Sequence, residues 1–398
     1  MLHGLLETGD ACTLFGKFNT ALSGFSVKQG FATKNGESYF SFAVLGDLLS
    51  DDKIIQKVEF SLSGMEEFFI PNGFKDEAKY KIDPLFSWET SYGCFEVGLK
   101  ASFKSIGGDI TARIYSRNET ANEELRTAYS DVIKNNPEAY FMHREKITYR
   151  AFLRTTKPAS CTELYEHIST LAGLFSVLIN APVHPEDIIA STREAQEPAP
   201  TKLVLLPSIM LDSRTIELTK QKRSHFNMPL TNSTIDLTQI AKKWLEIPKR
   251  NSVMISSIQH ETGVRTEHSA HGDIVLYTTQ LEAISHTDGK KNEKYSYPIR
   301  RYGETTLQLA LGTIAKKYGH SEIGEFVSSI RNEIAHVGRP KKILVQITLR
   351  DLVDISRILQ LAVLGSMLHD LGVSTEGISK YMRVFCPKIV SFDEFRPD

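Results

Sequence analysis

The chain has 398 residues, of which 41% are hydrophobic and 24% are charged, and this composition excludes an intrinsically disordered protein. The length predicts two or three folded domains rather than one core. The net charge is -1, but the charge is distributed unevenly along the chain. Residues 1–200 contain 20 lysines and arginines and 27 acidic residues, whereas residues 201–398 contain 27 and 21. This excess of positive charge in the C-terminal half favours its contact with a polyanion.

The N-terminal part reads as β-rich. Short segments there combine β-branched and aromatic residues in partial alternation, and glycine, asparagine and aspartate separate them: Ala11–Phe18, Ser38–Val44, Ile55–Ser61 and Lys146–Thr155. Alternation with a period of two buries one face of a strand and leaves the other in water. We therefore expect an antiparallel sheet.

A single helix is predicted next, from Cys161 onward, with Ser160 as its N-cap and with apolar residues at helical spacing. Pro182 is expected to end it. The polar stretch Ser191–Pro200 predicts a surface loop, and the apolar run Lys202–Met210 predicts one more strand.

Beyond residue 228 the pattern changes to amphipathic helices. We predict them over Ile235–Glu246, Ile274–Ile284, Thr305–Tyr318, Glu322–Val337 and Leu349–Leu371. The last is the most apolar, which is typical of a helix at the centre of a bundle or against a second subunit. Between these helices, Gly289–Arg301 is predicted to be a basic loop with two tyrosines.

One predicted helix ends in residues that can carry chemistry. The helix Glu322–Val337 contains the run RNEIAH, which begins at Arg331 and ends at His336. Gly338 and Pro340 are expected to stop the helix directly after it. Five residues advance roughly 140° beyond a full helical turn, so the two side chains do not share a face. This geometry favours a site at an interface between two copies of the chain.

The run RNEIAH resembles the motif of an arginine followed four to six residues later by a histidine that marks the HEPN superfamily. The helix that follows it is strongly apolar, as in that superfamily, and the segment LYTTQLEAISH resembles an early HEPN helix. The N-terminal half, from HGLLETGDACTLFG through FNMPL, is similar to the N-terminal region of ApeA-type proteins. Those proteins join such a region to a HEPN domain and act in bacterial defence against phage.

The resemblance implies a metal-independent endoribonuclease that acts by abortive infection. In such enzymes the ribose 2′-OH attacks the adjacent phosphate and leaves a 2′,3′-cyclic phosphate and a 5′-OH. Arg331 would stabilise the charge of the transition state, because a guanidinium stays charged and its fork fits phosphate oxygens. His336 would be the general acid or base, and the sequence does not choose between these roles.

Further residues around the motif are assigned supporting parts. Asn332, one turn before His336, can orient its ring or simply solvate the helix end, and Glu333 supports the site or is an ordinary exposed helix residue. RNA-backbone contacts are predicted for basic residues that could equally be solvated: Arg339, Lys341, Lys342, Lys290, Lys291, Arg300 and Arg301.

Several other classes of site are not predicted. The four cysteines are scattered without a Cys-x-x-Cys pair, which indicates reduced structural thiols and a cytoplasmic location. We expect no metal, because His268 and His271 have the spacing to share one but no third ligand lies nearby, and no cofactor, since no glycine-rich phosphate loop is present. No apolar run approaches the roughly 20 residues of a membrane span, and Met1–Asp10 lacks the features of a secretory signal.

The sequence thus predicts an α+β protein of two domains. Residues 1–228 form a β-rich sensor or regulatory domain, residues 229–388 form an all-α HEPN bundle, and residues 389–398 form a tail. The expected partners are RNA, a phage-derived trigger and a second copy of the chain bound through the HEPN domain. Two alternatives stay open: a HEPN bundle that binds RNA or protein without cutting, and a recognition protein whose helices only dimerise.

Overall fold

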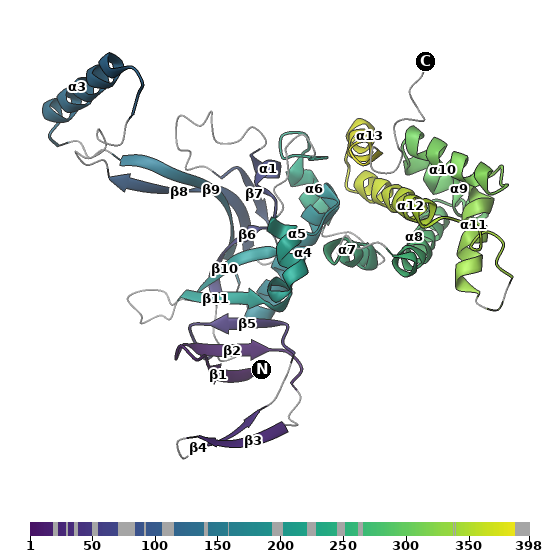
Figure 1. The fold of residues 1–398 in the computed structure, drawn as a ribbon, viewed down its shortest axis with the longest axis horizontal. Coiled ribbons are helices and arrows are strands. Elements are labelled where there is room, and N and C mark those ends of the chain that lie inside the picture. The colour runs from purple at the N-terminus through teal and green to yellow at the C-terminus, as the bar shows by residue number, and fades with distance from the viewer. Residues whose placement is uncertain are drawn as a thin grey trace.

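The protein is described by a computed structural model, which has a sheet region followed by a helical region (Figure 1). The structure describes residues 1–18, 23–28, 31–35, 39–49, 55–70, 84–90, 93–105, 115–138, 142–157, 159–192, 202–220, 228–244, 251–261, 266–336, 338 and 340–386. Figure 1 has the sheet at one end and helices α8 to α13 at the other, with α4 to α7 between them. This arrangement confirms the predicted α+β fold of two parts.

Among the described residues the main sheet has nine strands, and every pairing between them is antiparallel, as predicted. Its strand order is β1-β2-β5-β11-β10-β6-β9-β8-β7, and β3 and β4 form a separate hairpin. The strands span β1 Leu2–Leu5, β2 Ala11–Phe15, β3 Ser23–Lys28, β4 Phe31–Asn35, β5 Phe42–Leu45, β6 Ile55–Leu62, β7 Phe86–Glu89, β8 Gly93–Ser105, β9 Met142–Thr155, β10 Pro185–Thr192 and β11 Lys202–Pro207.

The helix α4 (Cys161–Ile179) provides the core of the sheet region. It begins where the sequence predicts, because Ser160 and Glu163 form a reciprocal capping box. It ends at Asn180, in the left-handed conformation, two residues before the proline that was expected to stop it. Phe175 on this helix packs against Phe68 and Phe69, from the short helix α1 (Glu66–Phe69).

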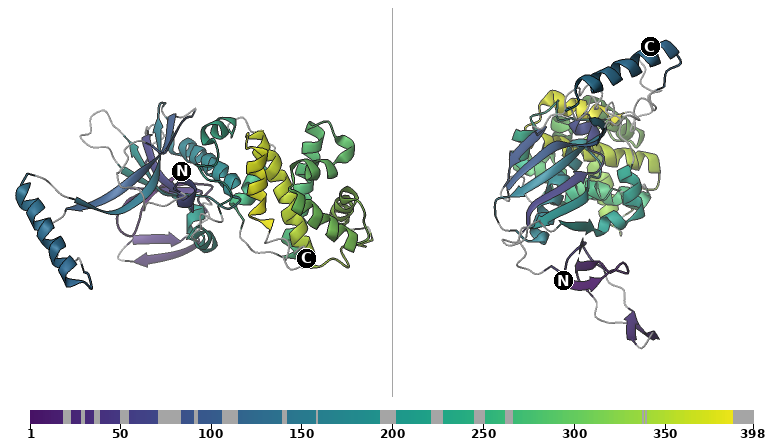
Figure 2. Two further views of the ribbon diagram at one scale, coloured as in Figure 1. Left: turned by 90° about the horizontal axis from the view of Figure 1, so that it is seen from above. Right: turned by 90° about the vertical axis from the view of Figure 1, so that its left-hand side faces the viewer.

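Several elements of the sheet region were not predicted individually, and β10 and α3 are the largest departures. β10 is a central strand, and Ser191 and Thr192 belong to it rather than to the predicted loop, whose other residues lie outside the described ranges. The helix α3 (Glu119–Asn135) projects from the tip of β8 and β9, beyond the sheet (Figures 1 and 2). No residue of α3 is buried. The helix therefore lacks the stripe of buried apolar residues from which an amphipathic helix is predicted.

The remaining helices lead into and form the helical region. They span α5 Ser213–Lys220, α6 Leu237–Trp244, α7 Ser252–Gln259, α8 Glu267–Thr287, α9 Ser296–Tyr302, α10 Thr305–Lys317, α11 Ile323–Ala335, α12 Leu349–Asp370 and α13 Thr375–Arg383. The predicted basic loop Gly289–Arg301 is wrong in part, because a short 3-10 turn (Lys291–Glu293) and α9 lie within it. Tyr295 and Ile299 anchor this segment, since both side chains are buried.

The helix α12 is the centre of the helical region, as its composition predicts. It packs against α8, α9, α10 and α13. Gly365 is required there, because a Cβ atom would lie 2.4 Å from the carbonyl oxygen of Tyr302. By length and composition α12 could cross a membrane, contrary to the expectation that no segment reaches that length, but 83% of its most apolar window is buried inside the protein. Such burial is that of a core helix.

The two regions touch directly. The hydroxyl of Tyr381 on α13 donates to the carbonyl oxygen of Val177 on α4 at 2.7 Å, in a fully buried position. The helix α6 also contacts the sheet region, since the indole Nε1 of Trp244 donates a hydrogen bond to the carbonyl oxygen of Thr170 at 3.0 Å. The domain boundary at residue 228 stays a prediction. All four cysteines are free thiols, as expected.

Candidate active site

The helix α11 carries Arg331 within its last turns and ends at the residue before His336. Its apolar stripe of Phe326, Val327 and Ile330 is buried, and this packing fixes the orientation of the helix. His336 is the C-cap residue, and its N–H donates to the carbonyl of Asn332 at 3.0 Å. Arg331 is half-buried, whereas the side chain of His336 is exposed. The motif therefore lies at the end of a packed helix, where the side chain of His336 is accessible to solvent.

The side chain of Asn332 has a different partner from the one that the sequence suggests. Its Oδ1 accepts a hydrogen bond from Nη1 of Arg331 at 3.3 Å. Asn332 thus orients the guanidinium group, and its link to His336 runs through the main chain. His336 lies outside the helix, at its C-cap, whereas Arg331 lies within its last turns.

Glu333 holds the chain that follows the motif. Its carboxylate accepts hydrogen bonds from three successive backbone N–H groups, those of Lys342, Ile343 and Leu344, at 3.0 to 3.2 Å. Burial alone would raise the pKa of Glu333, but these hydrogen bonds and the charge of Lys341 outweigh it and lower the pKa below its ordinary value. The carboxylate is therefore ionised and acts as a clamp on the returning chain.

Lys341 closes the same turn from the other side. Its ammonium group donates to the carbonyl oxygens of Glu333 and of His336, the latter at 3.0 Å. A cation at a helix C-terminus satisfies carbonyl groups that have no partner within the helix. Lys341, predicted to bind RNA, is thus engaged with the helix end, and the backbone of His336 is held on both sides while its ring stays exposed.

A second charged group lies beside Arg331. Nζ of Lys294 donates to Oε1 of Glu282, on α8, at 2.6 Å. The hydrogen bond and charge of Glu282 raise the pKa of Lys294, and the positive charge of Arg331 opposes this. The same arginine lies close enough to act on Tyr295, whose pKa is raised by burial and then by Glu282. Two positive charges, of Arg331 and Lys294, and the negative charge of Glu282 thus lie at the surface near the buried side chain of Tyr295.

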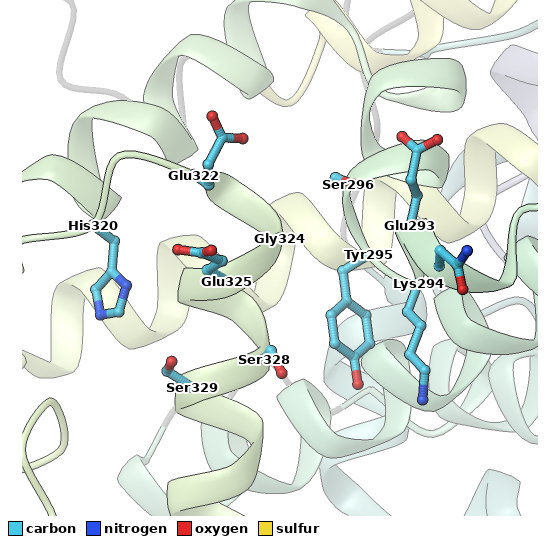
Figure 3. A pocket seen from close by; sticks show the side chains of 11 residues that line it. Glu293, Lys294, Tyr295, Ser296, His320, Glu322, Gly324, Glu325, Ser328 and Ser329 are labelled. Carbon is cyan, nitrogen blue, oxygen red and sulfur yellow. The ribbon is translucent and has the colours of Figure 1, made fainter.

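A cavity of about 590 Å³ lies next to this surface, between α11 and the segment that leads into α9 (Figure 3). Figure 3 shows side chains from α11 on one wall and Tyr295 and Lys294 on the other. Its lining includes Ser328, Ser329 and His320. Sequence reasoning missed these residues, although Glu325, Ser328, Ser329 and Asn332 recur at three- and four-residue spacing and so mark one polar helix face.

The other predicted RNA contacts differ in their surroundings. Lys342, Lys290, Lys291 and Arg301 are exposed, and Arg301 lies over the ring of Tyr302 at 5.8 Å. Arg300 is paired with Glu293, which reduces the charge that it can offer to RNA. Arg339 lies outside the described residues. Within the described ranges no group of three or more histidine, cysteine, aspartate or glutamate residues could hold a metal ion.

Comparison with known proteins gives one match. The family model described as ApeA N-terminal domain 1 matches residues 1–244, which covers the whole sheet region and extends through α6. No curated protein and no solved structure matches the chain. The match ends before the helices that carry Arg331 and His336.

Proposed function

The chain belongs to the ApeA N-terminal domain 1 family, and from this membership we propose that it is an anti-phage defence protein whose helical region is a HEPN-type endoribonuclease. The observation that carries the proposal is the end of α11. There an exposed histidine follows a half-buried arginine by five residues, and Glu333 and Lys341 hold the backbone between and after them. A fixed helix end is a suitable support for a catalytic pair.

The reaction would be an internal transfer of the phosphodiester. The 2′-oxygen of the ribose forms a bond to phosphorus, the bond from phosphorus to the 5′-oxygen breaks, and the products are a 2′,3′-cyclic phosphate and a 5′-OH. His336 would take the 2′ proton or supply the proton of the 5′-OH. Arg331 would stabilise the extra negative charge on the phosphate oxygens, which is largest in the transition state.

We further propose that two copies of the chain build each cleft. Five residues advance roughly 140° beyond a full helical turn, so one substrate phosphate would reach both side chains more easily if the arginine of one copy faced the histidine of the other. The expected partners are then RNA and a second copy of the chain. The sheet region would be the sensor that restrains cleavage until a phage-derived trigger is present, in keeping with a cytoplasmic protein.

The first test is cleavage of total RNA by the purified full-length protein in EDTA, with product ends mapped. Arg331→Ala and His336→Ala are each expected to lower cleavage by at least about 100-fold, because each removes a group that acts in the transition state. Arg117→Ala and His286→Ala, both at exposed positions distant in sequence from the motif, are matched controls that should cut like the wild type. Equal cleavage by all variants would refute the assignment.

Mixing the two inactive variants tests the shared cleft. A dimer of one Arg331→Ala chain and one His336→Ala chain retains one cleft with both groups if each cleft combines two copies, and none if each chain builds its own. Partial recovery of cleavage is expected in the mixture. If purified protein is inactive without its trigger, phage protection in cells replaces the cleavage assay. Full protection by both variants would favour a binding module.

A further inference from the structure

The cavity between α11 and the segment that leads into α9 lies beside Arg331, and we call it the α11 cavity (Figure 3). Its volume of about 590 Å³ lies within the roughly 300 to 1,000 Å³ that is usual for small-molecule sites. Ser328 is part of its lining and precedes Arg331 by three residues, so the two side chains are neighbours on the surface of the helix. The charge of Arg331 also acts on Tyr295, which lines the same cavity. A substrate group in the α11 cavity would therefore lie next to the guanidinium group.

The hydroxyl group of Tyr295 is a polar group that has no partner among the described residues. Only 7% of the residue is exposed, so packing fixes the position of its ring. Within the described ranges no hydrogen bond involves this hydroxyl group, and its pKa is raised by burial and then by the charge of Glu282. Figure 3 shows Tyr295 in the wall of the cavity opposite α11. A hydroxyl group on a buried side chain that borders a cavity is one that a ligand can satisfy.

The charged side chains of the lining fall into two groups. Lys294 and Glu293 each have an oppositely charged partner outside the lining. The side chains of Glu322 and Glu325, in contrast, have neither a hydrogen bond nor an ion pair in the part of the chain that the structure describes. The unpaired charge of the α11 cavity is therefore negative, whereas the guanidinium group beside it is positive.

This distribution of charge determines which part of an RNA each position favours. A phosphodiester group is an anion, so carboxylates in the cavity repel it and the guanidinium group of Arg331 attracts it. The part of the RNA that suits the cavity is the neutral nucleoside. A carboxylate only accepts hydrogen bonds, so it selects a base by the N–H groups on the edge of that base. Guanine presents two such donors side by side, N1–H and the 2-amino group, whereas uracil presents a single imide N–H.

We propose that the α11 cavity binds the base next to the phosphate that is cut and prefers guanine. The inference rests on the proposed function, because it takes RNA as the substrate. Glu325 accepts from N1–H and the 2-amino group, and the hydroxyl group of Tyr295 contacts the nucleoside from the other wall. Glu325 precedes Arg331 by six residues, or about 9 Å along the helix, which matches the reach of a nucleotide from its phosphate to the far edge of guanine. Glu322 is nine residues away, or about 14 Å, and lies beyond that reach.

The test measures binding rather than cleavage, so that the two proposals can fail separately. Full-length His336→Ala protein is titrated in EDTA into short labelled RNAs that contain a single guanosine, a single inosine or only uridine, and fluorescence anisotropy gives the affinities. Inosine lacks only the 2-amino group of guanosine. We expect the guanosine RNA to bind at least about fivefold more tightly than the other two, which is the lower end of what a bidentate contact to a base supplies.

Two results would overturn the proposal, and they differ in what they leave standing. Equal affinity for the three RNAs, together with weaker binding when Arg331→Ala is added, would remove the base preference and leave an RNA site at the end of α11. No binding of any of the three RNAs would remove the base preference and the proposed function together.

Substitutions in the same His336→Ala protein assign the preference to the α11 cavity. Glu325→Gln leaves one acceptor oxygen where the carboxylate has two, so the preference for guanosine over inosine should vanish. Glu376→Gln, at an exposed position on α13, is the matched control and should keep the preference. Tyr295→Phe keeps the buried ring and removes the hydroxyl group, so the guanosine RNA should bind about three- to tenfold more weakly. Circular dichroism checks that the variants fold. An undiminished preference in a folded Glu325→Gln protein would contradict the role of this carboxylate and with it the proposal.

Discussion

The sheet region and the helical region are built from contacts of different range. In the sheet, β6 lies between β9 and β10, so that Lys57 pairs with both Arg154 and Ser191. In the helical region the candidate active site is contained within one helix end and the turn after it, from Arg331 to Leu344. The candidate site is therefore local, whereas the sheet exists only when distant segments of the chain pair. Four predictions test this difference, from the largest expected effect to the smallest.

The first prediction concerns Phe175, at the centre of the sheet region with 1% exposure. Phe175→Ala should lower the free energy of unfolding of this region by about 3 to 5 kcal/mol, because a large buried ring is lost. Both tryptophans, Trp88 and Trp244, report on this region, since neither lies in helices α8 to α13. In chemical denaturation the transition reported by tryptophan fluorescence should move to a lower denaturant concentration. The later transition, in which the helical region unfolds, should keep its midpoint. A common shift of both signals would show one cooperative unit.

The second prediction concerns Glu333, the clamp of the local site. Glu333→Gln replaces a carboxylate that accepts three backbone N–H groups, and charge-assisted hydrogen bonds contribute about 1.5 to 3 kcal/mol. We expect RNA cleavage to fall by about tenfold or more, with kcat reduced more than KM changes, because the position of His336 becomes less fixed. The matched control is Glu376→Gln, at an exposed position on α13. If Glu333→Gln left kcat unchanged, Glu333 would not be needed to position His336.

The third prediction concerns Asp354 on α12. Burial raises its pKa from the ordinary value of 3.8 to about 6, and the positive charges of Arg350 and Arg357 only partly oppose this rise. A raised carboxyl pKa contributes stability that is present below about pH 4 and is lost as the pH rises through about 6. Asp354→Asn should therefore raise the free energy of unfolding at pH 8 by on the order of 1 to 3 kcal/mol, and the gain should vanish near pH 4. Thermal denaturation across this range measures it, and a gain independent of pH would contradict the cause.

The fourth prediction concerns the contact between the regions. Tyr381→Phe removes the hydroxyl that donates to the carbonyl of Val177 and leaves this buried acceptor with only the longer hydrogen bond, at 3.4 Å, from the N–H of Asn180. The free energy of unfolding should fall by about 1 to 2 kcal/mol, with little change in packing. Hydrogen exchange at α4 and α13 should increase together if the two regions are coupled there. An increase at α13 alone would show that α4 is independent of this contact.

Local signals account for what could be predicted. Ser160 and Glu163 mark the start of α4 through their capping box, and the apolar stripe of α11 fixes both its extent and the position of Arg331. Gly338 and Pro340 predict the end of this helix at Val337, and the helix ends at Ala335, two residues earlier. These features depend on neighbours within a few positions along the chain, so a pattern in the sequence is sufficient to find them.

Other features needed the tertiary structure. The helix α3 buries no side chain, so it gives no apolar stripe against a core, and β10 is a short apolar segment whose place at the centre of the sheet depends on strands far away in the sequence. Lys341 is a basic residue of the kind that can bind RNA. In the folded turn, however, its ammonium group donates hydrogen bonds to carbonyl oxygens at the end of α11.

By itself the sequence determined the α+β division and the central apolar helix, because both follow from the spacing of apolar residues along the chain. The catalytic hypothesis for Arg331 and His336 comes from the resemblance of the run RNEIAH to the HEPN motif. Only the tertiary structure decided which polar groups are already satisfied and which are not. Glu333 and Lys341 have their partners in a neighbouring turn, whereas Nε2 of His184 is buried among segments from three parts of the chain and has none among the described residues. Satisfaction of a buried polar atom depends on everything that packs around it, and this is fixed by the fold as a whole.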